Sequence, residues 1–265
     1  MFKFNDLKGV LLTMAIIFLV TNSVIALEMQ PVSIRAIALG GAYCAIADDL
    51  GFATSNPAGL AKSNYWQIGT SYTNVLNQDI DFSWFGIITP PTRIGNMAIS
   101  YSSLADSVFG YKEEWKSFAV GKNVYFNTYL GLCYTDFTLV SFEQARGQEV
   151  LCGFLYTPAP WKVGLAVKTN SLKFRDGTLE SSSRATLGLA YEVKDKTVVA
   201  DLDSNKEWRV GLERKLNEQI AVRCGLTQWK WTFGFGIQEG CWQLDYAYCN
   251  NDIGNEHQIG MKRRF

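Results

Sequence analysis

Large apolar residues alternate with small or polar residues along the last part of the chain. One run holds Trp229, Trp231, Phe233, Phe235 and Ile237, and the next holds Trp242, Leu244, Tyr246 and Tyr248. A period of two predicts β-strands whose two faces differ. The residues between are lysine, threonine, glycine, glutamine, aspartate and alanine, so an aromatic face lies opposite a polar one. This pattern is typical of a transmembrane β-barrel, with lipid outside and a polar interior.

The alternation recurs from Tyr65 to the end of the chain. We predict fourteen strands, near residues 65–73, 80–89, 94–102, 114–121, 124–135, 148–157, 160–169, 184–192, 195–202, 207–214, 218–226, 228–237, 241–248 and 256–265. An even number is expected for a single-chain bacterial barrel. The predicted fold class is therefore all-β, a transmembrane antiparallel β-barrel over residues 64–265.

The facing of several strands follows from their charges. We expect Trp161, Val163, Leu165 and Val167 to face lipid, and Lys162, Gly164, Ala166 and Lys168 to face the interior. A shift by one residue would place two lysines in hydrocarbon, at about 2–4 kcal/mol each near the midplane. The strands near 80–89 and 148–157 show no clear preference.

The links between the predicted strands differ in length. Links after even-numbered strands are short, and the three longest, 104–112, 137–146 and 171–183, follow odd-numbered strands. Barrels of the outer membrane have short periplasmic turns and longer outside loops. The three long links are therefore predicted to be loops on the outer side.

The N-terminus predicts export. Lys3 and Lys8 precede an apolar run from Val10 to Val20, and small residues lead to Ala26. This pattern indicates a signal peptide over residues 1–26, cleaved after Ala26. An uncleaved anchor is the alternative, although the run is shorter than the roughly 20 residues of a spanning helix. An exported barrel is expected in the cell outer membrane.

Composition removes several classes of protein. The chain holds 25 basic and 25 acidic residues, without the basic patch that nucleic-acid binding needs. A mean hydropathy of -0.01 is too low for a helical membrane protein. The expected partners are outer-membrane lipid and the barrel-assembly machinery, for which Ile259, Met261 and the terminal Phe265 form the predicted recognition signal.

Neither catalysis nor a cofactor is predicted. His257 is the only histidine, so no histidine partner exists for a dyad or metal site, and no G-x-S-x-G is present. Alternation places Cys152 and Cys224 on apolar faces and Cys133 and Cys241 on polar ones, without C-x-x-C spacing. Most of the six cysteines are expected to be small strand residues, with one disulfide left open.

The predicted interior is rich in glycine and alanine but also carries charge of both signs. Its charged residues are Lys162, Lys168, Glu192, Asp201, Arg209, Glu213, Arg223, Lys230 and Asp245. One interpretation is a wall of mutual ion pairs, because unpaired charge in a narrow lumen is costly. The other is a permeation path or a ligand-contacting wall.

Residues 27–63 lack the period of two. They include Gly40 and Gly41, which permit positive φ or close contact, then Asp48 and Asp49, then Asn56-Pro57-Ala58. Asn56 is expected to cap a short helix that starts at Pro57. A segment of this size, rich in small residues, is predicted to fold into the barrel as a plug.

These residues carry a resemblance to a known family. Leu39-Gly-Gly-Ala-Tyr, Ala47-Asp-Asp and Asn56-Pro-Ala before the first strand resemble the N-terminal region of FadL-type outer-membrane transporters and related PorV/PorQ-type barrels. The end, from Gln243 to Tyr248 and from His257 to Gly260, is similar to the closing hairpin of PorV-like members. The resemblance implies fourteen strands with the N-terminal segment inside, its Asn56-Pro57-Ala58 turn forming part of a hatch.

The resemblance leaves two functions open. FadL-type members let hydrophobic molecules diffuse across the outer membrane, whereas PorV-type members carry exported proteins. We expect passive transport of small or hydrophobic compounds, without chemistry. The alternative is a secretion or surface-assembly component that binds an exported protein.

Overall fold

The computed structural model describes residues 32–75, 80–106, 108–140, 144–250 and 254–265. The predicted signal peptide, residues 1–26, lies outside the described residues, as do 27–31. Among the described residues, none of the helices has the length and apolarity to cross a membrane.

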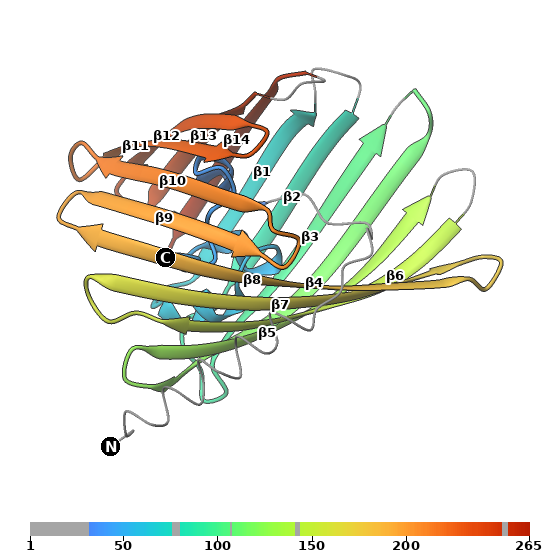
Figure 1. Cartoon of the computed structure of the whole chain (residues 1–265), viewed down its shortest axis with the longest axis horizontal. Helices are drawn as coiled ribbons and strands as arrows, with labels where there is room; N and C mark the ends of the chain where they lie inside the picture. Colours follow the sequence, from blue (N-terminus) through green and yellow to red (C-terminus); the bar gives the residue numbers. More distant parts are fainter. Residues whose placement is uncertain (1–31, 76–79, 107, 141–143, 251–253) are drawn as a thin grey trace.

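Fourteen antiparallel strands form one closed barrel in sequence order, with β1 pairing with β14 (Figure 1). The predicted number of strands and the predicted fold class are confirmed. The strands are β1 Gln67–Val75, β2 Ile80–Ile88, β3 Asn96–Asp106, β4 Tyr111–Tyr125, β5 Thr128–Val140, β6 Gln144–Tyr156, β7 Trp161–Phe174, β8 Leu179–Val193, β9 Lys196–Asp203, β10 Trp208–Lys215, β11 Ile220–Thr227, β12 Trp231–Glu239, β13 Trp242–Cys249 and β14 Glu256–Arg264. We call the end of the barrel that holds Gln67 and Phe265 proximal, and the opposite end distal.

An exposed apolar band surrounds the barrel. On alternate positions, Leu132, Leu189, Phe233 and Ile259 expose 53%, 48%, 46% and 48% of their surface. An exposed belt of this kind on a closed barrel is the surface that lipid covers. On β7, Lys162 and Lys168 face inward as predicted, because each forms an ion pair with an inward residue of a neighbouring strand.

The three predicted outer loops are mostly strand. β4 and β8 each have 15 residues, and β3 to β8 absorb most of 104–112, 137–146 and 171–183. Figure 1 shows β6 to β8 continuing well past the ends of β9 and β10. The prediction of long loops was therefore wrong, and the links are short at both ends of the barrel.

The distal ends of β2 to β7, which we call the distal extension, reverse the apolar face. On β5, Leu130 and Leu132 point outward and are exposed, but further along Asp136 is exposed and Phe137 is 1% exposed. Inward apolar side chains from these strands form one core: Phe82, Trp84, Leu104, Trp115, Phe137 and Leu172. Trp115 stacks on Phe137 with ring centroids 4.2 Å apart. A polar outside and an apolar inside suit water, so the extension stands clear of the lipid.

The two faces of β11 supply a test of this register. Cys224 lies outward, paired with Leu212 and Phe233, whereas Ala221 lines a polar cavity inside. Cys224→Lys should cost about 2–4 kcal/mol because it places charge in lipid, and Ala221→Lys should cost clearly less. Folding titrations into lipid vesicles measure both values. Equal losses would mean that the faces of β11 are assigned wrongly.

Candidate functional site: the plug segment and two cavities

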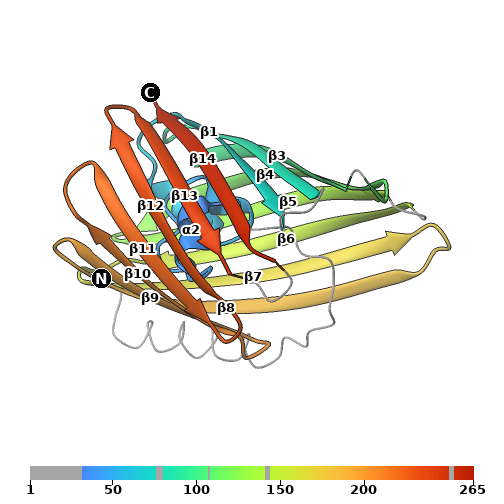
Figure 2. The ribbon, with the colours of Figure 1, turned by 90° about the horizontal axis from the view of Figure 1, so that it is seen from above.

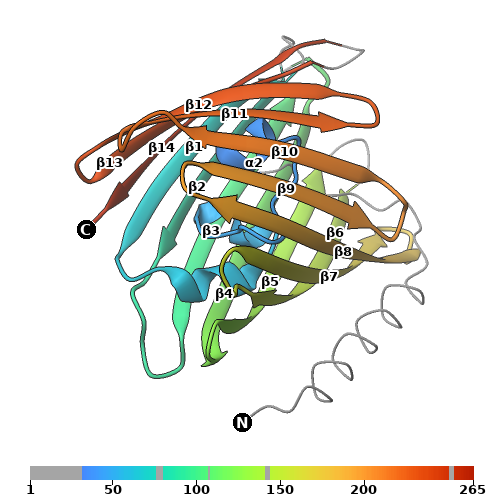
Figure 3. The ribbon, with the colours of Figure 1, turned by 60° about the vertical axis from the view of Figure 1, so that its left-hand side comes forward.

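The described part of the N-terminal segment, residues 32–63, lies inside the barrel and is called the plug segment (Figures 2 and 3). It contains the α-helix α2 (Ile34–Ala38) and the 3-10 helices η1 (Leu50–Ala53) and η2 (Pro57–Lys62). α2 packs against β11 to β14, whereas η2 packs against β3 to β6. The plug segment therefore bridges opposite walls.

α2 begins and ends with local signals. The hydroxyl of its N-cap, Ser33, accepts a hydrogen bond from the amide of Ala36 at 3.2 Å. Gly40 and Gly41 follow with φ of +70° and +81°, where side chains are disfavoured. A Cβ on Gly40 would also lie 3.0 Å from the Leu226 nitrogen. These glycines let the chain turn after α2 while its backbone lies against the backbone of β11.

Asn56 ties η2 to its surroundings. Its side-chain oxygen accepts from the amide of Ala58 at 3.1 Å, which makes it the N-cap, and Pro57 takes the first helical position. Its amide group donates to the carbonyls of Cys44 at 2.9 Å and Phe154 at 3.0 Å. Asn56 is fully buried, so a single side chain joins two parts of the plug segment to β6.

Three inward glycines make room for η2. Gly131 pairs with Gly121 on β4 and with Gly153 on β6, which leaves a strip of wall without side chains. A Cβ on Gly131 would lie 2.2 Å from the carbonyl carbon of Pro57, and one on Gly153 would lie 2.1 Å from Asn56 Oδ1. The start of η2 rests directly on the strand backbone.

We predict that Asn56→Ala loosens the plug segment without unfolding the barrel. Loss of the cap should cost about 0.5–2 kcal/mol, because the Ala58 amide and two buried carbonyls lose a partner. The measurement is limited proteolysis between residues 40 and 60 of the folded protein. Asn64→Ala, at an exposed position, is the control and should leave the cleavage rate unchanged. Similar rates in both variants would contradict this role.

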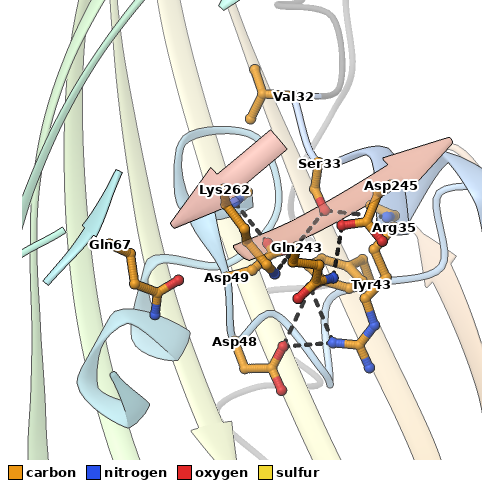
Figure 4. Close-up of polar contacts among 12 residues, drawn as sticks. Val32, Ser33, Arg35, Tyr43, Asp48, Asp49, Gln67, Gln243, Asp245 and Lys262 are labelled. Carbon is orange, nitrogen blue, oxygen red and sulfur yellow. Dashed lines mark hydrogen bonds and ion pairs between the residues drawn. The ribbon is translucent and has the colours of Figure 1, made fainter. Parts of the chain in front are cut away.

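A chain of ion pairs holds α2 to the wall formed by β10, β11 and β13. Arg35 donates to both carboxylate oxygens of Glu213, at 2.7 and 2.8 Å, and to Asp48 at 2.7 Å. Arg223 donates to Glu213 and to Asp245, each at 2.7 Å. Figure 4 shows Arg35 beside Asp48, with Asp245 nearby. Glu213 and Arg223 are almost fully buried, so these charges depend on one another.

The two aspartates predicted for the plug segment have different roles. Asp49 is the N-cap of η1 and accepts from Gly51 N at 2.8 Å and from Ser33 Oγ at 2.9 Å. Asp48 is partly buried beside Arg35. Burial alone would raise the pKa of the Asp48 carboxyl, but Arg35, with nearby lysines, outweighs it and holds that pKa well below its ordinary value. Asp48 is therefore an ionised carboxylate that pairs with the Arg35 side chain.

Most of the charged residues predicted for the wall lie in ion pairs. Lys162 pairs with Glu192, Lys168 with Glu149 at 3.6 Å, and Arg209 with Asp203 and Glu207 at 3.3 and 3.0 Å. These contacts match the interpretation of an ion-paired wall. A different carboxylate, Asp201, binds the plug segment directly, accepting from the amides of Tyr43 and Cys44 at 2.8 and 2.9 Å.

Lys230 is placed differently from the prediction. Instead of lying on a strand, it lies in the link between β11 and β12. Its amide donates to Thr227 Oγ1 at 2.9 Å, and its carbonyl accepts from Thr227 N at 2.8 Å. Because of this small turn, β12 begins three residues later than predicted. Lys230 is exposed at the distal rim, where it lines the distal cavity.

Two cavities lie on either side of α2. The proximal cavity, of about 370 Å³, is lined by Arg35 and Asp48 together with residues of β7, β8 and β10 to β14. The distal cavity, of about 500 Å³, is lined by Ala36 and Ile37 together with β10 to β14. Successive residues of one short helix therefore face different cavities, and α2 is the partition between them.

The other residues singled out in the sequence lie away from these cavities or carry no reactive arrangement. Ile259, Met261 and Phe265 point outward and are exposed. His257 contacts the Tyr246 hydroxyl at 2.8 Å on the outer surface. All six cysteines are described, and none of them forms a disulfide. Within the described ranges, no group of three His, Cys, Asp or Glu residues is placed to hold a metal ion.

Two residues that organise the site, Arg35 and Thr232, were not singled out in advance. Arg35 is the central cation, and the predicted wall residues Glu213 and Asp201 also bind the plug segment. Thr232 Oγ1 also donates to the carbonyl of Ala38 at 3.0 Å. Arg35 stands alone as a basic residue in a run of small and apolar residues, which is the only sequence signal that pointed to it.

The fold is similar to that of solved outer-membrane barrels. It matches the Pseudomonas putida toluene transporter TodX with a TM-score of 0.60 and 12% identity, over 91% of this chain and 98% of that one. It matches a Pseudomonas aeruginosa FadL homologue with a TM-score of 0.62 and 11% identity, over 91% and 99%. No protein-family model matches the sequence, and no curated protein matches it significantly. At these identities the likeness establishes the fold.

Proposed function

We propose that this chain is an outer-membrane barrel for passive transport of small compounds, closed at rest by the plug segment. The exposed apolar band and the closed barrel support a place in a bilayer. The similar structures named as a toluene transporter and a FadL homologue support transport without chemistry. In this proposal the proximal end faces the periplasm and the distal extension projects outside the cell.

The observation that carries the proposal is the position of α2 between two cavities. Arg35 lines one and Ala36 lines the other, so a shift of one short helix would join them. The distal extension has a packed core and offers no competing route. Polar contacts from Glu213 and Thr232 hold α2 in place.

The nature of the route narrows the range of compounds. Charged side chains line the proximal cavity, which suits hydrophilic solutes better than hydrocarbons. We therefore place small hydrophilic compounds ahead of hydrophobic ones.

Removal of residues 40–60 tests the proposal. The shortened chain should still form a barrel, recognised by its heat-modifiable migration in gels, because the strands of the closed barrel pair with one another and not with these residues. Its single-channel conductance in planar bilayers should exceed that of the full chain severalfold. Unchanged conductance would contradict transport. If the deletion instead abolished binding of a co-purifying exported protein, a PorV-like secretion role would replace it.

A further inference from the structure

The charges of the proximal cavity are not balanced by its own ion pairs. Its buried or partly buried acids are all engaged: Asp48 with Arg35, Glu192 with Lys162, and Glu213 with two arginines. Each of these carboxylates already has a cation of its own. The cations of these pairs take up most of this negative charge, although Asp48 and Glu192 also act on Lys62.

Lys262 lines the same cavity and forms an ion pair with Asp49, which lies outside the lining, at 3.8 Å. Three more cations also line it. Lys62 comes from η2, Lys215 from the end of β10 and Arg264 from the end of β14. Within the described chain, none of these three side chains makes an ion pair or a hydrogen bond. The remaining acid of the lining, Glu218, lies exposed in the turn between β10 and β11, and Lys215 is exposed as well, so water screens both charges. Lys62 and Arg264 are partly buried. The cavity therefore has an excess of unpaired positive charge.

Lys62 is the most constrained of the three cations. It is the last residue of η2, is partly buried and lies close enough to Lys162 and Arg35 to be repelled by them. Burial lowers the pKa of the Lys62 amine most, and Lys162 and Arg35 lower it further, although Asp48 and Glu192 act against the shift. A bound anion would relieve this repulsion. It would also replace part of the solvation that the Lys62 ammonium loses on burial.

We propose that the proximal cavity binds small organic anions, with a carboxylate or phosphate group held by Lys62 and assisted by Lys215 and Arg264. Its volume of about 370 Å³ lies at the small end of the roughly 300–1,000 Å³ range of ligand pockets, and its lining is mainly polar. The occupant is therefore a short hydrophilic acid rather than a long acyl chain. The consequence that transport favours anions rests on the proposed function.

Binding of succinate, a dianion near neutral pH, tests the site. In titration calorimetry of the detergent-solubilised full chain at low ionic strength, succinate should bind, and succinamide, its uncharged analogue, should not. Lys62→Gln should weaken succinate binding about tenfold, as expected for loss of one charge-assisted hydrogen bond. Lys173→Gln removes an exposed lysine from β7 and should leave the affinity unchanged. Equal heats for the two ligands, or an affinity unaffected by Lys62→Gln, would overturn the site.

A second measurement needs no variant. Acetylation of Lys62 in the native chain, followed by mass spectrometry, should slow severalfold at saturating succinate, whereas acetylation of Lys173 should not. Unchanged acetylation of Lys62 would also overturn the site. Conductance of the chain without residues 40–60 tests transport separately. If only the anion site is wrong, the shortened chain should still conduct. If only the transport proposal is wrong, the shortened chain should not conduct, but the full chain should still bind succinate.

Discussion

Replacing Glu213 with alanine should lower the free energy of unfolding by about 3–5 kcal/mol and detach α2 from the wall. Glu213 is the acceptor shared by Arg35 and Arg223, at distances of 2.7 to 2.8 Å, and its side chain is 3% exposed. Without it, Arg223 keeps Asp245 as its partner, and Arg35 keeps only the partly exposed Asp48. Two guanidinium groups would then lie in the interior with too little negative charge.

The control for this variant is an ion pair on the surface. Arg214 and Asp195 form one at 3.2 Å with side chains 58% and 42% exposed, so Asp195→Ala should cost less than about 1 kcal/mol. Folding titrations into lipid measure both losses, and bilayer conductance reports whether α2 has moved. Similar losses for the two variants would show that the buried network does not hold the plug segment.

Gly131→Val should displace η2 from the wall. The new Cβ would lie 2.2 Å from the carbonyl carbon of Pro57. Its nearest neighbours are all backbone atoms of Pro57 and Ala58, so no flexible side chain can move aside. Overpacking of this kind costs about 1–3 kcal/mol or more. Because Asn56 joins η2 to the carbonyl of Cys44, displacement should also expose Cys44, which is 2% exposed in the closed barrel.

Labelling of Cys44 by a maleimide, followed by mass spectrometry of its peptide, measures that exposure. In the native protein the reaction should be slow, because the thiol is buried and burial raises its pKa well above the ordinary value. Gly131→Val should speed it at least tenfold. Leu130→Val, at the neighbouring outward position, should not. A slow reaction in Gly131→Val would show that the wall accepts a side chain beneath η2.

The strands were predictable because their signal is local. Each needs only an alternation of apolar and polar positions over about eight residues, and the lipid imposes that alternation along the membrane-facing part of each strand. All fourteen predicted strands overlap observed ones. The prediction failed where the environment changes: beyond Tyr134 the apolar face of β5 moves inward to Phe137. The change of face looked like the end of a strand, so the distal extension was predicted as loops.

Local signals also indicated the parts of the N-terminal segment. Asn56 before Pro57 predicted a capped helix start, and Gly40-Gly41 indicated positive φ or close backbone contact, because both depend on backbone geometry within a few residues. The partners of that segment were not predictable in this way. Arg35 and Glu213 are 178 residues apart, and the sequence around either residue does not indicate the other as its partner.

The sequence by itself thus determined a lipid-facing barrel, its strand order and a separate N-terminal segment rich in small residues. The tertiary structure decided which wall each part of that segment touches, because closure of the barrel brings Glu213, Asp201 and the Gly121-Gly131-Gly153 strip to the plug segment. It also decided where space remains. The apolar core of the distal extension fills one side, so the cavities, and the partition formed by α2, lie beside β10 to β14.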